Sequence, residues 1–165
     1  MSVSLLPDDI TALARRVVED NRAAGRKVAV AESCTGGLVA AAITEIPGSS
    51  AVLDRAFVSY SNEAKRAMLG VAGDVIDAFG AVSIACVYAM AQGALEHSDA
   101  DVAVAISGIA GPDGGTEQKP VGTVVFARAT RHAEEREAES KLFATEDRSE
   151  VRRQATLCAL ELLLP

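Results

Sequence analysis

The stretch KVAVAESCTGGLVAAAI, residues 27–43, decides how this chain is expected to fold. Residues 27–31 form a short apolar run typical of a buried strand, and residues 38–43 are small and apolar, as in a helix that packs closely. Gly36 and Gly37 lie between the two segments. The stretch therefore predicts a strand that turns directly into a helix, which is the repeating unit of α/β proteins.

The alternation of strand and helix patterns continues along the rest of the chain. Further strands are expected at residues 56–61, 102–106, 121–129 and 135–143. Helices are expected from Pro7-Asp8-Asp9 to Gly25, around Lys65 with Asn62 as its cap, at residues 84–97 with Ser83 as a cap, and at residues 147–164. The last two strands are joined by a short turn and should pair antiparallel. We therefore expect one mixed sheet of about five strands with helices on both faces.

Length and composition fit a single domain over residues 1–165. The chain is 49% apolar and 24% charged, which is an ordinary globular composition, so a full core and a cleft are expected without disulfides or metals. Because the net charge is −7 and the basic residues are scattered, a nucleic acid is not an expected partner. The three cysteines are far apart and show no metal-ligand spacing, so neither structural zinc nor a disulfide framework is expected.

The sequence also carries expectations about location and assembly. It shows no signal-peptide pattern at its N-terminus and no apolar run near the roughly 18 residues of a membrane span. We therefore expect no membrane association and a cytoplasmic location. A homo-oligomer is expected as well, because symmetric dimers are the commonest oligomers of soluble proteins.

Ser33 follows the predicted strand at residues 27–31, at the point where the helix begins. Backbone N–H groups at a helix start stabilise an anion, including the oxyanion that develops during acyl transfer, so Ser33 is a candidate nucleophile. The structural alternative is that Ser33 or Thr35 only caps the helix. The G-x-S-x-G motif of α/β hydrolases is absent, because Ala31 and Thr35 stand at the glycine positions.

A glycine-rich segment, residues 108–115, follows the strand expected at residues 102–106. It holds four glycines in eight residues, and backbone without Cβ atoms can approach a phosphate or a flat ring closely. It matches neither the P-loop nor G-x-G-x-x-G. Lys119 beyond it and Arg148 at the start of the last helix are candidates to hold a phosphate. The alternative is a plain surface loop.

Lys65 is the candidate base for Ser33. Both histidines, His97 and His132, fall at positions expected to be exposed, which leaves lysine for this role. A lysine has an ordinary pKa of about 10.4 and becomes a useful base when burial disfavours its charge. Tyr60 could relay the proton. The alternative for a lone lysine is an exposed side chain on a helix.

Six segments of the chain, taken together and in order, resemble the CinA C-terminal domain family. They are residues 31–37, 60–65, 80–83, 107–116, 119–124 and 152–155. The resemblance covers nearly the whole chain. It implies a three-layer α/β/α sandwich with a mixed, mostly parallel sheet.

The resemblance also implies an activity, namely hydrolysis of nicotinamide mononucleotide to nicotinic acid mononucleotide and ammonia in pyridine-nucleotide recycling, a form of NAD salvage. It implies a Ser/Lys mechanism without metal or cofactor, in which Ser33, Tyr60 and Lys65 are the catalytic residues. We expect the substrate to contact Cys34, Thr35, Gly36, Gly37, Asn62, Gly108, Gly111, Gly114, Lys119 and Arg148.

Two positions depart from the family pattern. Ile84 stands where the family often has an acidic residue, and Glu146 replaces the glycine of a Gly-Asp-Arg turn. A glutamate close to a phosphate is unfavourable, so Glu146 bears on phosphate binding. Two other functions remain open from the sequence: a nucleotide-binding module without catalysis, and a hydrolase of another small amide. Release of ammonia from a panel of amides distinguishes them.

Overall fold

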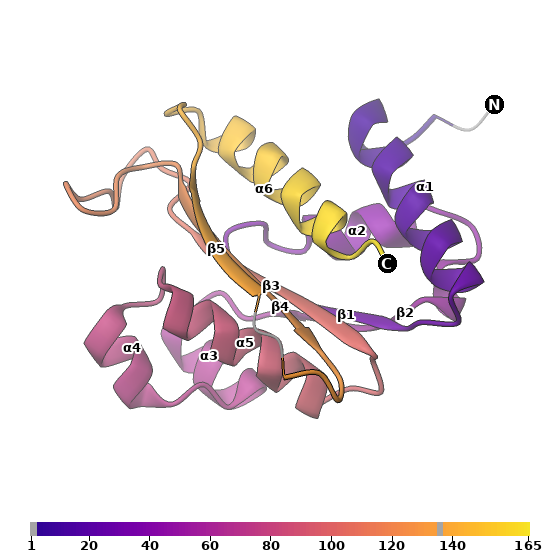
Figure 1. Cartoon of the computed structure of the whole chain (residues 1–165). Coiled ribbons are helices and arrows are strands. Elements are labelled where there is room, and N and C mark those ends of the chain that lie inside the picture. The colour runs from indigo at the N-terminus through magenta and orange to yellow at the C-terminus, as the bar shows by residue number, and fades with distance from the viewer. Residues whose placement is uncertain (1–2, 135–136) are drawn as a thin grey trace.

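The computed structural model describes residues 3–134 and 137–165 and consists of three layers. Helices α1, α2 and α6 lie on one face of a central sheet, and α3, α4 and α5 lie on the other (Figure 1). The α/β/α sandwich predicted from the sequence is confirmed. The strands are β1 (Val28–Glu32), β2 (Leu53–Val58), β3 (Val102–Gly108), β4 (Thr123–Thr130) and β5 (Glu137–Leu142).

The sheet has the strand order β2-β1-β3-β4-β5. Strand β1 pairs in parallel with β2 and β3, whereas β4 is antiparallel to both β3 and β5. Four of the five strands thus run in one direction and only β4 opposes them. Because β1 and β2 are parallel neighbours, the turns that follow them lie at the same edge of the sheet, where open α/β sheets place their binding sites.

Most helices match the sequence patterns, with shifts at their ends. They are α1 (Asp8–Ala23), α2 (Leu38–Thr44), α3 (Asn62–Leu69), α4 (Gly73–Phe79), α5 (Ile84–Glu96) and α6 (Arg148–Leu162), together with a short 3-10 turn, η1 (Ser49–Ala51). Ser83 caps α5 as expected, since its side chain accepts a hydrogen bond from the N–H of Cys86.

Three expectations about the elements need correction. The strand expected at residues 56–61 lies three residues earlier, because Ser61 caps α3 by accepting from the N–H of Ala64 at 3.0 Å. Asn62 is therefore the first residue of α3 and not its cap. Helix α4 was not expected at all. The strand expected at residues 135–143 is observed as β5, although residues 135 and 136 lie outside the described part of the chain.

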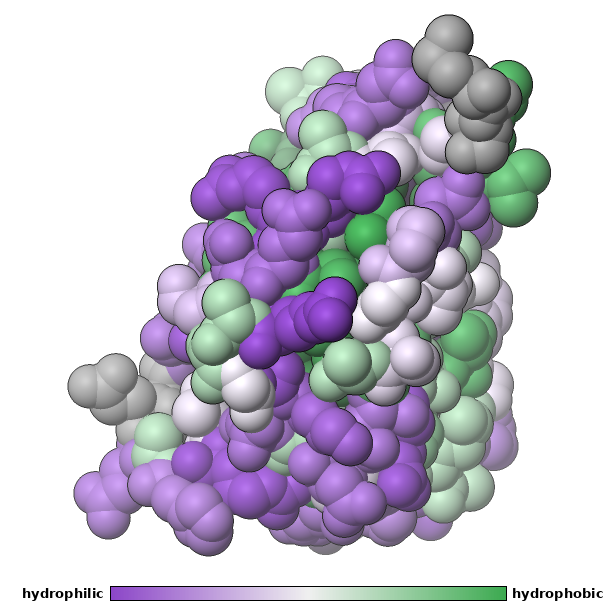
Figure 2. Space-filling view, turned by 90° about the vertical axis from the view of Figure 1, so that its right-hand side faces the viewer, coloured by the Kyte–Doolittle hydropathy of each residue, from purple (hydrophilic) through white to green (hydrophobic). Residues whose placement is uncertain are grey.

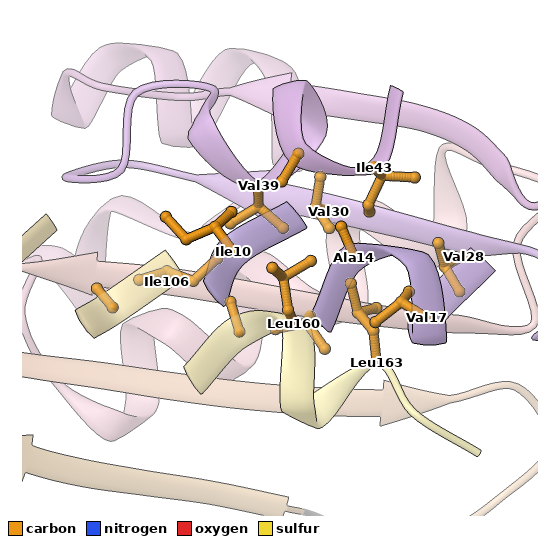
Figure 3. Packing of buried hydrophobic residues seen from close by; sticks show 14 of the residues in the cluster. Ile10, Ala14, Val17, Val28, Val30, Val39, Ile43, Ile106, Leu160 and Leu163 are labelled. Atoms are coloured by element: carbon orange, nitrogen blue, oxygen red, sulfur yellow. The ribbon is translucent and has the colours of Figure 1, made fainter. Parts of the chain in front are cut away.

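The two faces of the sheet carry side chains of different size. Toward α1, α2 and α6 the strands present valines and larger residues, and Figure 3 shows Val28, Val30 and Ile106 among the side chains of these helices. Toward α5 the strands present mainly alanines: Ala29, Ala31, Ala103, Ala105, Ala127 and Ala129. These small side chains let α5 lie close to the sheet.

Gly93 of α5 sets how closely α3 approaches. A Cβ atom at this position would lie 2.0 Å from the carbonyl oxygen of Leu69, which ends α3. Because α3 carries Lys65, the close approach of α3 and α5 also determines where that side chain reaches. Packing therefore requires a glycine at position 93. The backbone conformation does not, because it is helical and suits any residue.

Figure 2 shows hydrophilic residues over much of the face on the right of Figure 1, with hydrophobic residues between them. Within residues 3–134 and 137–165, no helix has the length and apolar character needed to cross a bilayer.

The packing of α3 on α5 predicts the effect of Gly93→Ala. Alanine favours a helix by about 1 kcal/mol over glycine, but the new methyl group meets the backbone of Leu69, and overpacking of this kind destabilises by about 1–3 kcal/mol. We expect a net loss of stability in urea unfolding. Gln92→Ala, on the exposed side of the same turn, is the control and should change stability by less than about 0.5 kcal/mol. A Gly93→Ala variant more stable than the parent would contradict this account.

Candidate active site

Ser33 lies directly beyond the end of β1, in a tight turn. Its N–H donates to the carbonyl of Ile106 at 3.1 Å, which continues the pairing of β1 with β3. Its own carbonyl accepts from the N–H of Gly36 at 2.9 Å, which closes the turn before α2. The side chain is only 7% exposed. The backbone therefore fixes the direction in which the Ser33 hydroxyl points.

Lys65 reaches Ser33 from α3, the helix that follows β2. The amine nitrogen Nζ lies 3.1 Å from Ser33 Oγ, and it also lies 3.0 Å from the carbonyl oxygen of Ser59 and 2.9 Å from that of Tyr60. With 1% of its surface exposed, Lys65 is among the largest fully buried side chains of the protein. A lysine this deeply buried is not the exposed helix residue that was the structural alternative.

Both protonation states of Lys65 can satisfy these three contacts, since an ammonium group donates to all three oxygens. A neutral lysine has two N–H bonds and one lone pair, so it can donate to both carbonyls while the lone pair faces the Ser33 hydroxyl. Burial lowers the pKa of Lys65, because the charged form loses its hydration. Among the described residues, no carboxylate forms an ion pair with this amine. The lowered pKa makes the neutral amine more accessible in Lys65 than in an exposed lysine.

Glu32 occupies the start of α2. Its buried carboxylate accepts hydrogen bonds from the N–H groups of Gly37, Val39 and Ala40 at 3.0–3.2 Å. Such charge-assisted bonds contribute about 1.5–3 kcal/mol each and complement the positive end of the helix. Because these donors are already satisfied, the start of α2 is not available to hold an anionic group of a substrate.

A pocket of about 300 Å³ opens above the Ser33 and Lys65 side chains. Its lining comes from the turns after β1, β2 and β3, from the segment before α5 and from the start of α6. The lining residues are Ser33, Cys34, Tyr60, Asn62, Lys65, Ala81, Val82, Ser107, Gly108, Ile109, Ala110, Gly111, Asp113, Gly114 and Arg148. The nucleophile candidate and the glycine-rich segment thus share one cavity.

Arg148 joins two walls of this pocket. Its guanidinium donates to the carbonyl of Gly111 at 2.6 Å and to the hydroxyl of Tyr60 at 3.2 Å. Since a guanidinium has five N–H donors, further donors remain for a ligand. The phenol ring of Tyr60 is 59% exposed. In the described part of the chain its hydroxyl bonds to Arg148 and to neither Ser33 nor Lys65.

Comparison with protein families decides where this chain belongs. The model of the CinA C-terminal domain matches residues 10–165, which is nearly the whole chain. The chain belongs to the CinA C-terminal domain family. The resemblance noted from the sequence motifs is therefore confirmed.

Relatives of this CinA domain include named enzymes and solved structures. The chain is 52% identical over 158 residues to the nicotinamide-nucleotide amidohydrolase PncC of Escherichia coli K12, covering 94% of this chain and 93% of that protein. It is 54% identical to a CinA-like protein of Akkermansia muciniphila, of which it covers only 33%. The crystal structure of the competence/damage-inducible protein CihA from Agrobacterium tumefaciens has a TM-score of 0.94 and 49% identity, covering 98% of this chain and 97% of that one.

The structure brings most of the expected site residues of this CinA domain together, but not all. Thr35, Gly36, Gly37 and Lys119 do not line the pocket. The N–H of Gly37 is bound by Glu32, and that of Gly36 by Ser33. Lys119 donates to the carbonyl of Phe79, at the end of α4, at 2.8 Å. Helix ends attract lysines, because their last carbonyl groups lack partners within the helix.

Several residues at this site of the CinA domain were not singled out from the sequence. Glu32 and Arg152 both contact the Ser33 turn, and Ser107 and Asp113 line the pocket. A signal for Glu32 existed, because a glutamate just before a predicted helix complements the helix dipole. For Arg152 the signal was the resemblance of residues 152–155 to the family, but its contacts could not be inferred, since its partners lie more than a hundred residues away in the chain.

The two departures from the family pattern lie outside the pocket. Glu146 is exposed and does not line the pocket, while Asp147 caps α6 by accepting from the N–H of Ser149 at 2.9 Å. Arg148 is therefore still presented at the pocket despite the missing glycine. Ile84 is the first residue of α5 and is 43% exposed.

The other titratable side chains do not compete with Ser33. Burial raises the pKa of the Cys34 thiol to about 11, so this thiol stays protonated near neutral pH. Both His97 and His132 are exposed and lie outside the pocket, as the sequence predicted. Within residues 3–134 and 137–165, no three metal-ligating side chains of His, Cys, Asp or Glu gather at one point.

The buried amine predicts how stability changes with pH. The lowered pKa of Lys65 means that the unfolded chain binds a proton more readily than the folded one, up to the ordinary pKa of 10.5. Stability should therefore rise with pH in that window, by about 1.4 kcal/mol for each pH unit between the lowered pKa and 10.5. Lys65→Met lacks this contribution.

Urea unfolding of the parent and of Lys65→Met from neutral to alkaline pH measures the effect. The difference in the free energy of unfolding, parent minus variant, should grow as the pH rises. The contributions of all other titrating groups cancel in this difference. A difference that is constant, or that falls with pH, would show that burial does not lower the pKa of Lys65.

Proposed function

We propose that this protein hydrolyses the carboxamide of nicotinamide mononucleotide to nicotinic acid mononucleotide and ammonia, with Ser33 as the nucleophile and Lys65 as the base. The observation that carries the proposal is the 3.1 Å contact between Ser33 Oγ and the buried Nζ of Lys65, at the floor of a pocket. The relatives named nicotinamide-nucleotide amidohydrolase, which match over most of their length, support the choice of substrate.

The first half-reaction is acyl transfer to Ser33. The hydroxyl oxygen attacks the carboxamide carbon while its proton passes to the lone pair of Lys65. The N–H of Cys34, a residue that lines the pocket, stabilises the oxyanion together with the N–H of Thr35 directly behind it; within the described residues, neither N–H donates a hydrogen bond to another residue. The tetrahedral intermediate then expels the amine, which takes the proton back from Lys65 and leaves as ammonia.

The second half-reaction releases the product. Lys65 accepts a proton from a water molecule, which attacks the ester carbon, and the Ser33 oxygen leaves with that proton. We assign direct proton transfer between Lys65 and Ser33, because the Tyr60 hydroxyl is bonded to Arg148. Tyr60 serves this step through its backbone carbonyl, which accepts from the Lys65 amine at 2.9 Å and orients it.

The pocket suits a mononucleotide. Its volume of about 300 Å³ is at the lower end for small-molecule sites, which favours one nucleotide over two. We assign Arg148 to the phosphate, because it is the arginine in the pocket lining and planar guanidinium groups bind phosphate well. Asp113 is assigned to the ribose hydroxyls, for which a carboxylate is a good acceptor. Because the chain has a net charge of −7, this local arginine must outweigh a repulsive field.

Ser33→Ala tests the nucleophile. Ammonia release from nicotinamide mononucleotide should be lost, while binding of the product measured by calorimetry should persist, because the variant lacks only the attacking oxygen. Ser107→Ala is the matched control, since Ser107 is a second buried serine in the pocket whose hydroxyl bonds to the carbonyl of Ala81. It should stay active.

The outcomes of this test separate the competing functions. Substantial turnover by Ser33→Ala would show that another group is the nucleophile. A parent protein that binds the mononucleotide without releasing ammonia would be a nucleotide-binding module. Activity on other small amides, but not on the mononucleotide, would indicate a different amidohydrolase.

Arg148→Gln tests recognition of the phosphate. A charge-assisted hydrogen bond contributes about 1.5–3 kcal/mol, and about 1.4 kcal/mol corresponds to tenfold in rate. We therefore expect kcat/KM for the mononucleotide to fall by about 10- to 100-fold, and kcat/KM for nicotinamide riboside to change much less.

Lys119→Gln is the control for the loss of a positive charge. Lys119 lies beyond the glycine-rich segment but bonds to the carbonyl of Phe79, so kcat/KM of this variant should resemble that of the parent for both compounds. If Lys119→Gln were the variant that lost the mononucleotide preference, the assignment of the phosphate to Arg148 would be wrong.

A further inference from the structure

We propose that Arg152 of α6 is a positioning residue that holds the Ser33 turn in the conformation needed to stabilise the oxyanion. The inference rests on the proposed acyl-transfer function of Ser33. It concerns a side chain that lies behind the turn, outside the pocket, and therefore acts without touching the substrate.

The contacts of Arg152 are directed at the backbone of the turn. Its Nε donates to the carbonyl of Cys34 at 3.0 Å, and one terminal nitrogen donates to the carbonyl of Thr35 at 3.3 Å. These are the two residues that directly follow Ser33. A Cβ atom on Gly36 would lie 3.3 Å from the same guanidinium, so the turn and the arginine are closely packed.

The planarity of the peptide bond converts these contacts into an orientation of N–H groups. In a trans peptide the C=O and the following N–H point in opposite directions. Because Arg152 holds the Cys34 carbonyl on its side of the turn, the N–H of Thr35 points away from Arg152. That N–H donates to no other residue in the described part of the chain, and with the N–H of Cys34 it is assigned to the oxyanion.

Glu32 and Arg152 hold different parts of the segment from Ser33 to α2. The Glu32 carboxylate accepts hydrogen bonds from N–H groups at the start of α2, whereas Arg152 donates hydrogen bonds to the carbonyls of the turn before it. Between these two, the Thr35 N–H is left without a partner. The guanidinium of Arg152 bonds to two carbonyls at once. This explains why position 152 holds arginine, since a lysine presents a single nitrogen.

The experiment compares Arg152→Lys and Arg152→Gln with the parent. The matched control is Arg153→Gln, since Arg153 is the next residue of α6 but pairs at the surface with Glu150 and Asp9. Two readouts are used: kcat and KM for nicotinamide mononucleotide, and the rate at which a small fluorophosphonate labels Ser33, followed by intact mass. In labelling, the Ser33 oxygen bonds to phosphorus, fluoride leaves, and Lys65 takes the hydroxyl proton.

We expect both Arg152 variants to lose kcat by about 10- to 100-fold, a loss below that of removing a donor outright, with KM nearly unchanged. Labelling should slow in parallel but still reach completion. The pH at which kcat is half-maximal should not move, because the burial of Lys65 is unaltered. Arg153→Gln should match the parent in every readout.

Three outcomes would overturn the role of Arg152. They are a variant with the parental melting temperature and the parental kcat, a loss confined to KM, and labelling that stops at a partial fraction, which would indicate damaged protein. Labelling does not depend on the natural substrate. A parent that is labelled at Ser33 but releases no ammonia from the mononucleotide would therefore refute the proposed function, while the labelling rates still test Arg152.

Discussion

One buried amine, held by neutral oxygens, is the central constraint on the candidate site. Lys65 sits behind Ser33 with two backbone carbonyls as its other partners, and no carboxylate in the described residues stabilises its charge. A charged group in such a place is costly, and burial accordingly lowers the pKa of Lys65. The parallel pairing of β1 with β2 supplies Ser33 and both carbonyls at one edge. The glycine at position 93 lets α5 approach α3, which carries the amine.

Two side chains of opposite charge, Glu32 and Arg152, lie close to Ser33 and bind backbone groups instead of its hydroxyl. The Glu32 carboxylate accepts from N–H groups at the start of α2, and Arg152 donates to the carbonyls of the turn. Neither side chain lines the cavity. In many α/β proteins a helix start of this kind binds the phosphate of the ligand. Here that position is filled from within, and the proposed phosphate contact lies instead at Arg148, which joins the glycine-rich segment to Tyr60.

Much of this arrangement can be predicted from the sequence, for reasons that are local. Residues 27–43 specify a strand, a turn and a helix through apolar pattern and glycine, and Ser83 is recognisable as a cap. Strand β2 is harder to place, because three of its six residues are exposed at the edge of the sheet and the apolar pattern is broken. Lys119 was expected at the phosphate because its neighbours in sequence suggest an anion site, whereas its long side chain reaches a helix end outside the pocket. The role of Arg152, unlike that of Glu32, depends on contacts that form only when the layers pack together.

The contact between Arg152 and the Ser33 turn joins residues that are 118 positions apart. Chains rich in such long-range contacts fold slowly, because a large loop must close before the contact forms. A refolding chain can therefore bring β1 beside β2, and Ser33 beside Lys65, before α6 has docked. In that interval Ser33 and Lys65 lie side by side, but the turn that follows Ser33 still lacks its contacts with Arg152. The support of this turn therefore comes from α6, at the far end of the chain, and not from the strand that carries Ser33.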